Sequence, residues 1–219
     1  MKRPGSVLLL SLPNSGSTWT AELMAKRIPG HYAMEYFNPL RNPERGEILK
    51  RNFGCELIEC YRNIVTTGDE HVHADIERTW DRDGYTFTKE VFSPAKLPIF
   101  VQHFERVVVL LRRTEGVFPP SRLRIWAFYE HAWHALREAG HMVRAETDRD
   151  RAYEAHQRLS AMLRRDARAL GVPVVDYEEF FGDDDTVLEA ARILDPNNQY
   201  MLAANLIMSR RPKGQGVML

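Results

Sequence analysis

Hydroxyl-bearing residues, a glycine and an amide are concentrated in one short segment of the chain. The segment Pro13-Asn14-Ser15-Gly16-Ser17-Thr18-Trp19 follows a compact apolar run at residues 6–12 and precedes a stretch with helical spacing of apolar residues. A helix that begins there leaves its first backbone N–H groups without intrahelical partners, next to the positive end of its dipole. Backbone and hydroxyl donors at such a turn suit an oxyanion. The segment therefore predicts a binding site for phosphate or a related anion.

The same segment lacks the residues that nucleoside triphosphatases need. Their loop has the form G-x-x-x-x-G-K-[ST], in which the lysine reaches the β- and γ-phosphates. Here Ser17 follows Gly16 where the lysine would stand, and no glycine opens the segment. The pattern disfavours ATP hydrolysis and leaves two interpretations, an anion site of another kind or an ordinary polar turn.

Residues 12–19 resemble the 5′-phosphosulfate loop of sulfotransferases that use 3′-phosphoadenosine-5′-phosphosulfate (PAPS), commonly written P-[KR]-S-G-[ST]-[ST]-W/L. The resemblance implies a sulfotransferase of P-loop fold. The residues that it places around the 5′-phosphosulfate are Asn14, Ser15, Gly16, Ser17 and Thr18. It also places Trp19 against the adenine, with a core position as the alternative. Asn14 departs from the pattern, because an amide donates a hydrogen bond but brings no charge to the leaving group.

A second motif stands where the family has its 3′-phosphate site. In sulfotransferases a strand is followed by an arginine and, eight positions later, by a serine, and the two residues hold the 3′-phosphate of the nucleotide. Here the apolar run 107–111 is followed by Arg113, and Ser121 stands eight residues after it. A guanidinium offers a phosphate two parallel hydrogen bonds, and the 3′-phosphate distinguishes PAPS from ATP. Without the first motif, Arg113 would read as a surface arginine at a strand end.

Two weaker similarities extend the resemblance toward the C-terminus. Tyr177, in the segment VVDYEEF, matches the tyrosine that lies beside the adenine in sulfotransferases, and a partly buried core tyrosine is the alternative. The segment RPKG in the tail resembles the basic loop that closes over the 3′-phosphate, with Pro212 interrupting it. Its candidate ligands are Arg211, Lys213 and Gly214, and a basic tail without fixed structure is the alternative.

Three residues are candidates for the transfer chemistry itself. Glu35 lies in GHYAMEYF, which resembles the stretch after the first helix of bacterial trehalose and glycolipid sulfotransferases, whose glutamate is the proposed base. A carboxylate there would take the proton of the acceptor hydroxyl, and a solvated loop carboxylate is the alternative. Lys89 and Glu90, in TKEVF, stand where cytosolic sulfotransferases carry a K-T-H segment. Lys89 would stabilise charge on the sulfuryl or leaving phosphate group, and Glu90 is the second candidate base.

These similarities predict transfer of a sulfuryl group from PAPS to a hydroxyl of a small molecule, with release of adenosine 3′,5′-bisphosphate and no metal ion. The stretch around Glu35 favours a carbohydrate or glycolipid acceptor and leaves its identity open, as the sequence leaves the oligomeric state. One alternative is a small-molecule or nucleotide kinase of P-loop fold, which needs a loop lysine and a carboxylate for Mg²⁺. The other, suggested by Asn14, is a PAPS-binding protein whose catalysis has decayed.

The composition of the chain restricts its partners and its location. Its 219 residues suit a single domain over 1–219, and 30 basic against 30 acidic residues give no net field that would favour nucleic acid. Cys55 and Cys60 match neither a disulfide framework nor a zinc site, so we expect a reducing cytoplasm. The segment His71-Val72-His73 lacks a third ligand and predicts no metal site. No apolar stretch of the sequence approaches the ~20 residues of a membrane span.

Expected strands and helices alternate along the chain and hold these candidate residues. Strands are expected at 6–12, 85–91, 106–111 and 173–176, and helices at 18–27, 121–139, 150–170 and 184–194. Residues 41–83 have the least regular pattern, with short helices expected at 47–53 and 55–65. The alternation predicts an α/β fold of three layers, here a P-loop fold whose central, mostly parallel sheet is flanked by helices. Ligands then bind outside the carboxyl ends of the strands.

Overall fold

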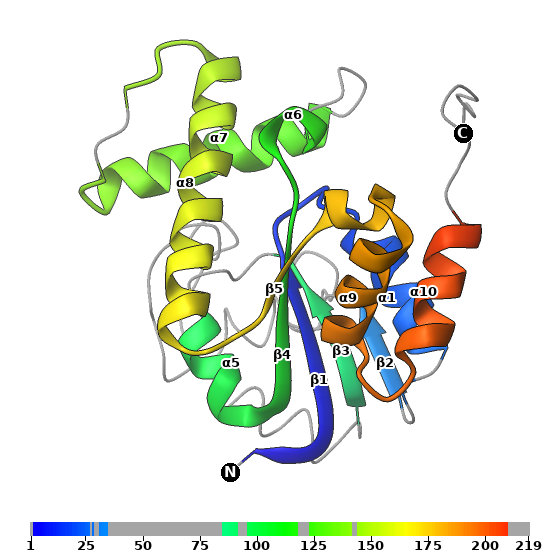
Figure 1. Cartoon of the computed structure of the whole chain (residues 1–219). Coiled ribbons are helices and arrows are strands. Elements are labelled where there is room, and N and C mark those ends of the chain that lie inside the picture. Colours follow the sequence, from blue (N-terminus) through cyan, green and yellow to red (C-terminus); the bar gives the residue numbers. More distant parts are fainter. Residues whose placement is uncertain are drawn as a thin grey trace.

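One parallel β-sheet organises the protein (Figure 1). The computed structural model describes residues 2–26, 28, 31–34, 85–91, 96–117, 123–141 and 144–209. Within these residues five strands pair in the order β2-β3-β1-β4-β5, and every pairing is parallel. The strands are β1 (Arg3–Ser11), β2 (His31–Met34), β3 (Tyr85–Glu90), β4 (Phe104–Leu111) and β5 (Val174–Asp176).

The strands β1 and β4, at the centre of the sheet, carry continuous apolar runs. Residues 7–10 of β1 and 107–111 of β4 are buried, and Leu8 lies opposite Val107 in the register. A strand that helices cover on both faces has no solvent side, so its apolar residues follow one another instead of alternating with polar ones. The composition of these two runs is therefore what makes them recognisable as strands in the sequence.

Helices cover both faces of the sheet (Figure 1). The helices of one face are α5 (Leu97–His103), α7 (Leu123–Glu138) and α8 (Asp148–Ala169). Those of the other face are α1 (Ser17–Ala25), α9 (Asp184–Leu194) and α10 (Gln199–Met208). Two short elements lie near the carboxyl ends of the strands, α6 (Thr114–Val117) and the 3₁₀ helix η2 (Tyr177–Phe181).

Successive residues of β1 point to opposite faces of the sheet, which gives the protein two hydrophobic cores. Leu8 and Leu10 pack in the cluster beneath α5, α7 and α8, whereas Val7 and Leu9 pack in the cluster beneath α1, α9 and α10. The predicted α/β arrangement, a parallel sheet flanked by helices, is confirmed. Its assignment to the P-loop folds and the single domain over 1–219 remain predictions.

Side-chain caps set the beginnings of two long helices. Asp183 accepts a hydrogen bond from the backbone N–H of Thr186 at 2.8 Å and begins α9, whose bounds match the sequence prediction. Thr147 caps α8 in the same way through the backbone N–H of Asp150, at 3.2 Å. Because Thr147 is the cap, α8 begins at Asp148, two residues before its predicted start.

Several elements lie where the sequence pattern predicts none. They are β2, α5, α6, η2 and α10. Of these, β2 ends at Met34, the residue before Glu35, and α10 precedes the basic tail. The helices expected at 47–53 and 55–65 lie outside the described residues. None of the described helices combines the length and the apolarity that crossing a bilayer requires.

Candidate anion-binding site

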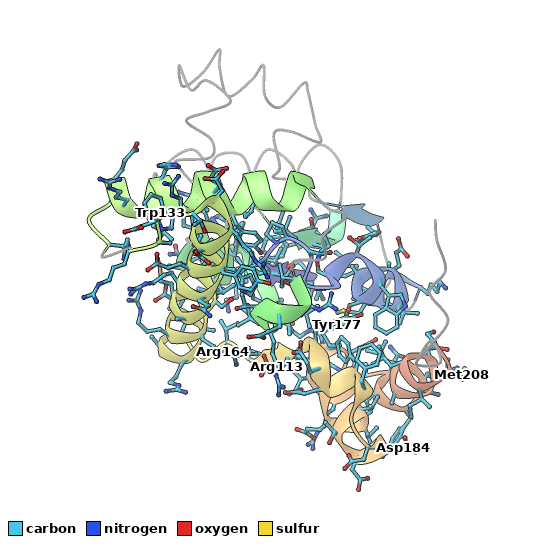
Figure 2. All side chains as sticks on the ribbon, turned by 90° about the horizontal axis from the view of Figure 1, so that it is seen from above. Arg113, Trp133, Arg164, Tyr177, Asp184 and Met208 are labelled. Atoms are coloured by element: carbon cyan, nitrogen blue, oxygen red, sulfur yellow. The ribbon has the colours of Figure 1, made fainter. Side chains whose placement is uncertain are left out.

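The topology of the sheet brings the carboxyl ends of its strands to one edge. β1 lies between β3 and β4, and β5 lies on the other side of β4. In the register, Leu10 of β1 pairs with Glu90 of β3, so the two strands end at the same level. The residues that follow the strands therefore meet at this edge, which is the ligand-binding end of an open parallel sheet. Figure 2 looks down on this edge, and Arg113 and Tyr177 lie near its middle.

The segment that leaves β1 turns sharply into α1, and we call residues 12–18 the anion loop. The backbone N–H of Ser15 donates to the carbonyl oxygen of Leu12 at 3.2 Å. Asn14 and Gly16 have positive φ values of 63° and 78°, and Gly16 is the N-cap of α1. Glycine and asparagine adopt this left-handed conformation at the least cost. The turn therefore explains why these two residue types stand at 14 and 16.

Hydrogen bonds with three residues outside the loop hold its first half. The hydroxyl of Tyr129 in α7 donates to the carbonyl oxygen of Pro13 at 2.9 Å. The side-chain amide of Asn14 donates to the carbonyl oxygen of Val117 in α6. The guanidinium of Arg112 donates to the carbonyl oxygen of Asn14 at 3.3 Å. The conformation of the loop is thus fixed by the fold, which lowers the entropy cost of binding a ligand.

Hydrogen-bond donors for an anion remain in the second half of the loop. The side chains of Ser15 and Ser17 are buried, with exposed fractions of 0% and 3%. Among the described residues, Ser15 Oγ has no hydrogen-bond partner. The first backbone N–H groups of α1, a helix of nine residues, lack intrahelical partners by their position. Burying a hydroxyl without a hydrogen-bond partner costs free energy, so a bound anion or a water molecule is expected to accept its hydrogen bond.

A buried lysine lies next to the first turn of α1. Lys89, near the end of β3, is 1% exposed, and its Nζ donates to Thr18 Oγ1 at 3.0 Å. Thr18 itself is exposed. The next residue, Glu90, is fully buried, and its Oε1 accepts a hydrogen bond from Thr88 Oγ1 at 3.4 Å. Because successive side chains of a strand point to opposite faces, Lys89 is directed to the α1 face of the sheet and Glu90 to the other.

An aromatic ring covers Gly16. Tyr177 begins η2 directly after β5, and a Cβ atom at position 16 would lie 2.1 Å from Tyr177 Cε2. Trp19 packs edge-on against Tyr177 and Phe180, with ring centroids 6.2 Å and 6.0 Å apart. Trp19 and Tyr177, both expected to contact an adenine, thus belong to one aromatic cluster beside the anion loop. Glycine is required at 16 for its φ and for its lack of a side chain.

Arg113, the predicted ligand of a 3′-phosphate, has an exposed side chain. Its backbone N–H donates to Glu178 Oε1 at 3.1 Å, which joins the end of β4 to η2. The structure therefore places Arg113 at the same edge as the anion loop and Tyr177 (Figure 2). The remaining predicted site residues lie outside the described residues, and they are Glu35, Ser121, Arg211, Lys213 and Gly214.

A tyrosine and a histidine support the anion loop from the side of α7 and α8. The ring of Tyr129 is buried and packs edge-on against His156, with centroids 5.2 Å apart. His156 Nδ1 and Thr114 Oγ1 form a hydrogen bond of 3.0 Å. Burial lowers the pKa of His156 from 6.5 to about 4, against the opposing effect of the Glu115 carboxylate. Burial also raises the pKa of Tyr129 well above its usual value, so this hydroxyl stays protonated and can donate its hydrogen bond to the carbonyl oxygen of Pro13.

Comparisons with protein-family models and with curated proteins find no match for this chain. The assignment of the site therefore rests on its own residues and on the sequence pattern of the anion loop. Within the part of the chain that the structure describes, no group of three or more His, Cys, Asp or Glu side chains is arranged to hold a metal ion.

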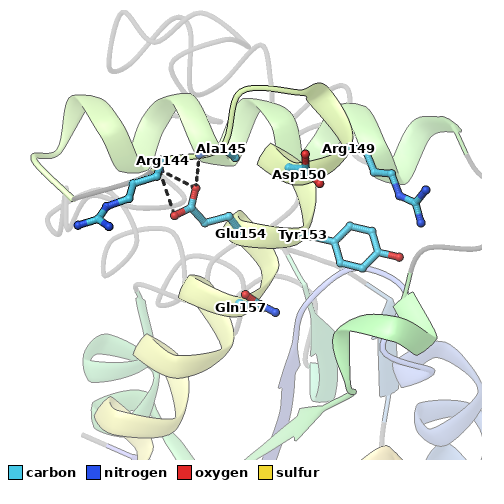
Figure 3. Close-up of a pocket in the computed structure, with 7 residues that line it drawn as sticks. All are labelled: Arg144, Ala145, Arg149, Asp150, Tyr153, Glu154 and Gln157. Atoms are coloured by element: carbon cyan, nitrogen blue, oxygen red, sulfur yellow. Dashed lines mark hydrogen bonds between the residues drawn. The ribbon is translucent and has the colours of Figure 1, made fainter.

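A separate pocket of about 630 Å³ lies along the first half of α8 and the segment that leads into it (Figure 3). Its lining residues are Arg144, Ala145, Arg149, Asp150, Tyr153, Glu154 and Gln157. The carboxylate of Glu154 accepts hydrogen bonds from the backbone N–H groups of Arg144 and Ala145, at 3.0 to 3.2 Å. Trp133 Nε1 donates to the same carboxylate at 3.0 Å. The side chains of Arg144 and Arg149 point in opposite directions, so the polar groups here hold the helix connection and do not converge on a ligand (Figure 3).

Two residues of the site are not marked by the sequence motifs. Arg112 contacts the anion loop, although the motif spacing selects its neighbour Arg113. Adjacent residues at a strand end point to opposite sides, so only the fold decides which arginine reaches the loop. Tyr129 is one of several aromatic residues of its helix, and its hydrogen bond to Pro13 has no counterpart in the local pattern.

Proposed function

We propose that the protein transfers a sulfuryl group from PAPS to the hydroxyl of a carbohydrate or another small molecule. The observation that carries the proposal is the anion loop between a buried parallel strand and a helix N-terminus, with Lys89 Nζ 3.0 Å from Thr18 Oγ1. A cation, backbone N–H groups and serine hydroxyls together suit a phosphosulfate group. The resemblance of residues 12–19 and the spacing of Arg113 and Ser121 favour PAPS among the nucleotides that carry such a group.

The residues of the anion loop fit a 5′-phosphosulfate. Ser15 Oγ is buried and lacks a hydrogen-bond partner among the described residues, and an oxygen of the anion would accept a hydrogen bond from it. Lys89 is nearly inaccessible to water, so its attraction for an anion is screened less than that of a surface lysine. When bound, PAPS supplies an activated sulfuryl group whose leaving group is adenosine 3′,5′-bisphosphate.

The chain provides a group for each charge and proton of the transfer. A carboxylate takes the proton of the acceptor hydroxyl, whose oxygen forms the new bond to sulfur. The bond between sulfur and the bridging oxygen breaks, and its electron pair remains on the 5′-phosphate of the released nucleotide. Lys89 stabilises that developing charge. Glu35 is the first candidate for the carboxylate, and Glu90, which is directed to the face of the sheet opposite Lys89, is the second.

Calorimetric titration tests the nucleotide specificity. We expect adenosine 3′,5′-bisphosphate to bind tightly without Mg²⁺, and ATP to bind weakly with or without it. A preference for Mg²⁺-ATP would replace this proposal with the kinase, for which Glu90 is the buried carboxylate on the strand next to β1. Turnover of PAPS with a panel of carbohydrate hydroxyls then separates catalysis from binding. Binding without sulfation of any acceptor would favour a PAPS-binding protein with decayed catalysis.

A variant at the 3′-phosphate site sharpens this titration. Arg113→Ala is expected to lower the affinity for adenosine 3′,5′-bisphosphate roughly 10- to 100-fold, the usual effect of losing hydrogen bonds between charged groups. The affinity for adenosine 5′-phosphate should not change. Arg192→Ala is the matched control, because Arg192 is an exposed arginine of α9 that pairs only with Glu189 among the described residues. Equal losses for both nucleotides would contradict the role of Arg113.

A further inference from the structure

The guanidinium of Arg112 is fixed against the anion loop by contacts on several sides. Its Nη1 donates to the carbonyl oxygen of Asn14 at 3.3 Å. Its Cζ lies 4.7 Å from the centre of the Tyr177 ring, and that ring covers Gly16. Gly116 leaves room for Arg112 Nε, because a Cβ atom at position 116 would lie 2.6 Å from it. The planar cation is therefore held beside positions 14 and 16 of the loop.

Arg112 also stands where the loop lacks a charge of its own. The sulfotransferase pattern has Lys or Arg at position 14, but here the amide of Asn14 donates to the carbonyl oxygen of Val117. The guanidinium of Arg112 contacts the backbone of the same residue. At the other end of the loop, Lys89 contacts Thr18. The anion loop thus lies between two cations, of which Lys89 belongs to β3 and Arg112 follows β4, the two strands adjacent to β1.

We infer that Arg112 is the second cation of the anion loop and binds the 5′-phosphate of the nucleotide, the leaving group of the transfer. The identity of that nucleotide rests on the proposed function, whereas the presence of an anion rests on the loop. A guanidinium has five N–H donors, and Asn14 uses one donor of Arg112 among the described residues. A phosphate oxygen is a stronger acceptor than the carbonyl oxygen, so the remaining donors are suited to an anion in the loop.

Arg112 and Arg113 would serve different phosphates. They follow β4 in succession, and the side chain of Arg112 contacts the anion loop whereas that of Arg113 is exposed. The 5′-phosphate is common to adenosine 5′-phosphate and adenosine 3′,5′-bisphosphate, and inorganic pyrophosphate presents a similar group without a nucleoside. Ligands with and without a 3′-phosphate therefore distinguish the two arginines.

The test is calorimetry without Mg²⁺ on the full chain, with pyrophosphate, adenosine 5′-phosphate and adenosine 3′,5′-bisphosphate as probes. Arg112→Met keeps the packing on Tyr177 and removes the charge. We expect it to lower the affinity for all three probes roughly 10- to 100-fold. Arg112→Lys keeps the charge without the forked donors, so it should recover part of the affinity. Arg113→Met is the matched control, and it should lower the affinity for adenosine 3′,5′-bisphosphate alone.

The outcomes separate this inference from the proposed function. Unchanged affinity of a folded Arg112→Met variant for pyrophosphate and adenosine 5′-phosphate would overturn the inference. If Arg112→Met loses affinity for both of these probes while the wild type binds the bisphosphate no more tightly than adenosine 5′-phosphate, Arg112 binds the 5′-phosphate. That result would support the inference and overturn the PAPS assignment. A wild type that binds none of the three probes would overturn both.

A second variant tests the same contact if Arg112→Met does not fold. Gly116→Ala keeps the charge and adds a Cβ atom 2.6 Å from Arg112 Nε, which displaces the guanidinium. Alanine is a better helix former than glycine, so the short helix α6 should not lose stability through its backbone. We expect weaker binding of pyrophosphate and adenosine 5′-phosphate at an unchanged melting temperature. Unchanged affinity for both probes in this variant would overturn the inference.

Discussion

The anion loop and the pocket at the start of α8 use their polar groups in opposite ways. In the pocket, Glu154 accepts hydrogen bonds from Trp133 and from two backbone N–H groups. In the loop, Ser15 Oγ has no partner among the described residues, and Lys89 and Arg112 approach from the neighbouring strands. The pocket offers about 630 Å³ of open space, whereas the loop offers a buried hydroxyl without a partner among the described residues and a cation at each end.

Open volume and the capacity to bind an anion are therefore separate properties of a surface. A carboxylate whose acceptor sites are used by its own chain stabilises the fold and has little left for a ligand. A hydroxyl that is held in place without a partner among the described residues, as Ser15 Oγ is, lowers the cost of binding an anion. Substitutions in the two regions should therefore separate loss of binding from loss of stability.

Gly16→Ala, in the anion loop, has the largest expected effect. An L-residue at the φ of Gly16, 78°, costs about 1–2 kcal/mol. The added Cβ atom would lie 2.1 Å from Tyr177 Cε2, and such overpacking adds roughly 1–3 kcal/mol. We expect the free energy of unfolding in urea to fall by the sum of the two costs, and binding of adenosine 5′-phosphate to be lost.

Two further variants separate the causes of that loss. Gly140 has a similar φ of 84° and no atom within 4 Å of an added Cβ, so Gly140→Ala should show the backbone cost alone. Tyr177→Ala in the Gly16→Ala background removes the ring and should restore part of the stability. Equal destabilisation by Gly16→Ala and Gly140→Ala would show that the ring does not constrain the loop.

His156, on the helix that also lines the pocket, should make stability depend on pH. Burial lowers its pKa from 6.5 to about 4, so between these values the folded protein binds fewer protons than the unfolded chain. The contribution is complete above pH 6.5 and is lost as the pH falls toward 4, by on the order of 3 kcal/mol. Melting temperatures of the wild type and of His156→Gln test this. The variant should lose less stability over the same range, and parallel profiles would contradict the assignment.

Glu154→Ala has the smallest expected effect and tests the pocket directly. Loss of the hydrogen bonds to Glu154 should reduce the free energy of unfolding by about 2 kcal/mol, because the indole N–H of the buried Trp133 is left without an acceptor and two backbone bonds are lost. Affinity for adenosine 5′-phosphate should not change. Glu146→Ala removes an exposed carboxylate of the same corner and should change stability by less than about 0.5 kcal/mol. A loss of nucleotide affinity in Glu154→Ala would contradict the view that the pocket stabilises the fold while the anion loop binds the nucleotide.

The parts of the fold that the sequence predicted are those with a strong local signal. β1 and β4 are continuous apolar runs, because both faces of each strand are buried. The helix α9 begins at its cap Asp183 and shows an apolar face with helical spacing, so its predicted bounds match. These signals are contained in the residues themselves and need no distant partner.

The elements that were missed have weak local signals. β2 has four residues and pairs only with β3 in the described sheet, so its strand character depends on that neighbour. The helix α5 has seven residues, too few to show a period, and Pro98 in its first turn adds to a pattern that also suits a loop. In α10 the exposed positions include Met201 and Met208, so no polar face reveals the helix. Packing against the sheet, which is not local, stabilises these segments.

The class of the fold, the position of the turn after β1 and the hydrogen-bond donors available in that turn follow from the sequence alone, because apolar runs and turn-forming residues act locally. Ser15 and Gly16 were identified in that way, whereas Lys89 was identified by the resemblance of its segment to sulfotransferases. Which side chains meet at the loop depends on the tertiary structure. It brought Lys89 to Thr18, placed Tyr177 over Gly16 and turned Arg112 toward the loop, because these contacts depend on the order of the strands and on the side to which each strand end points.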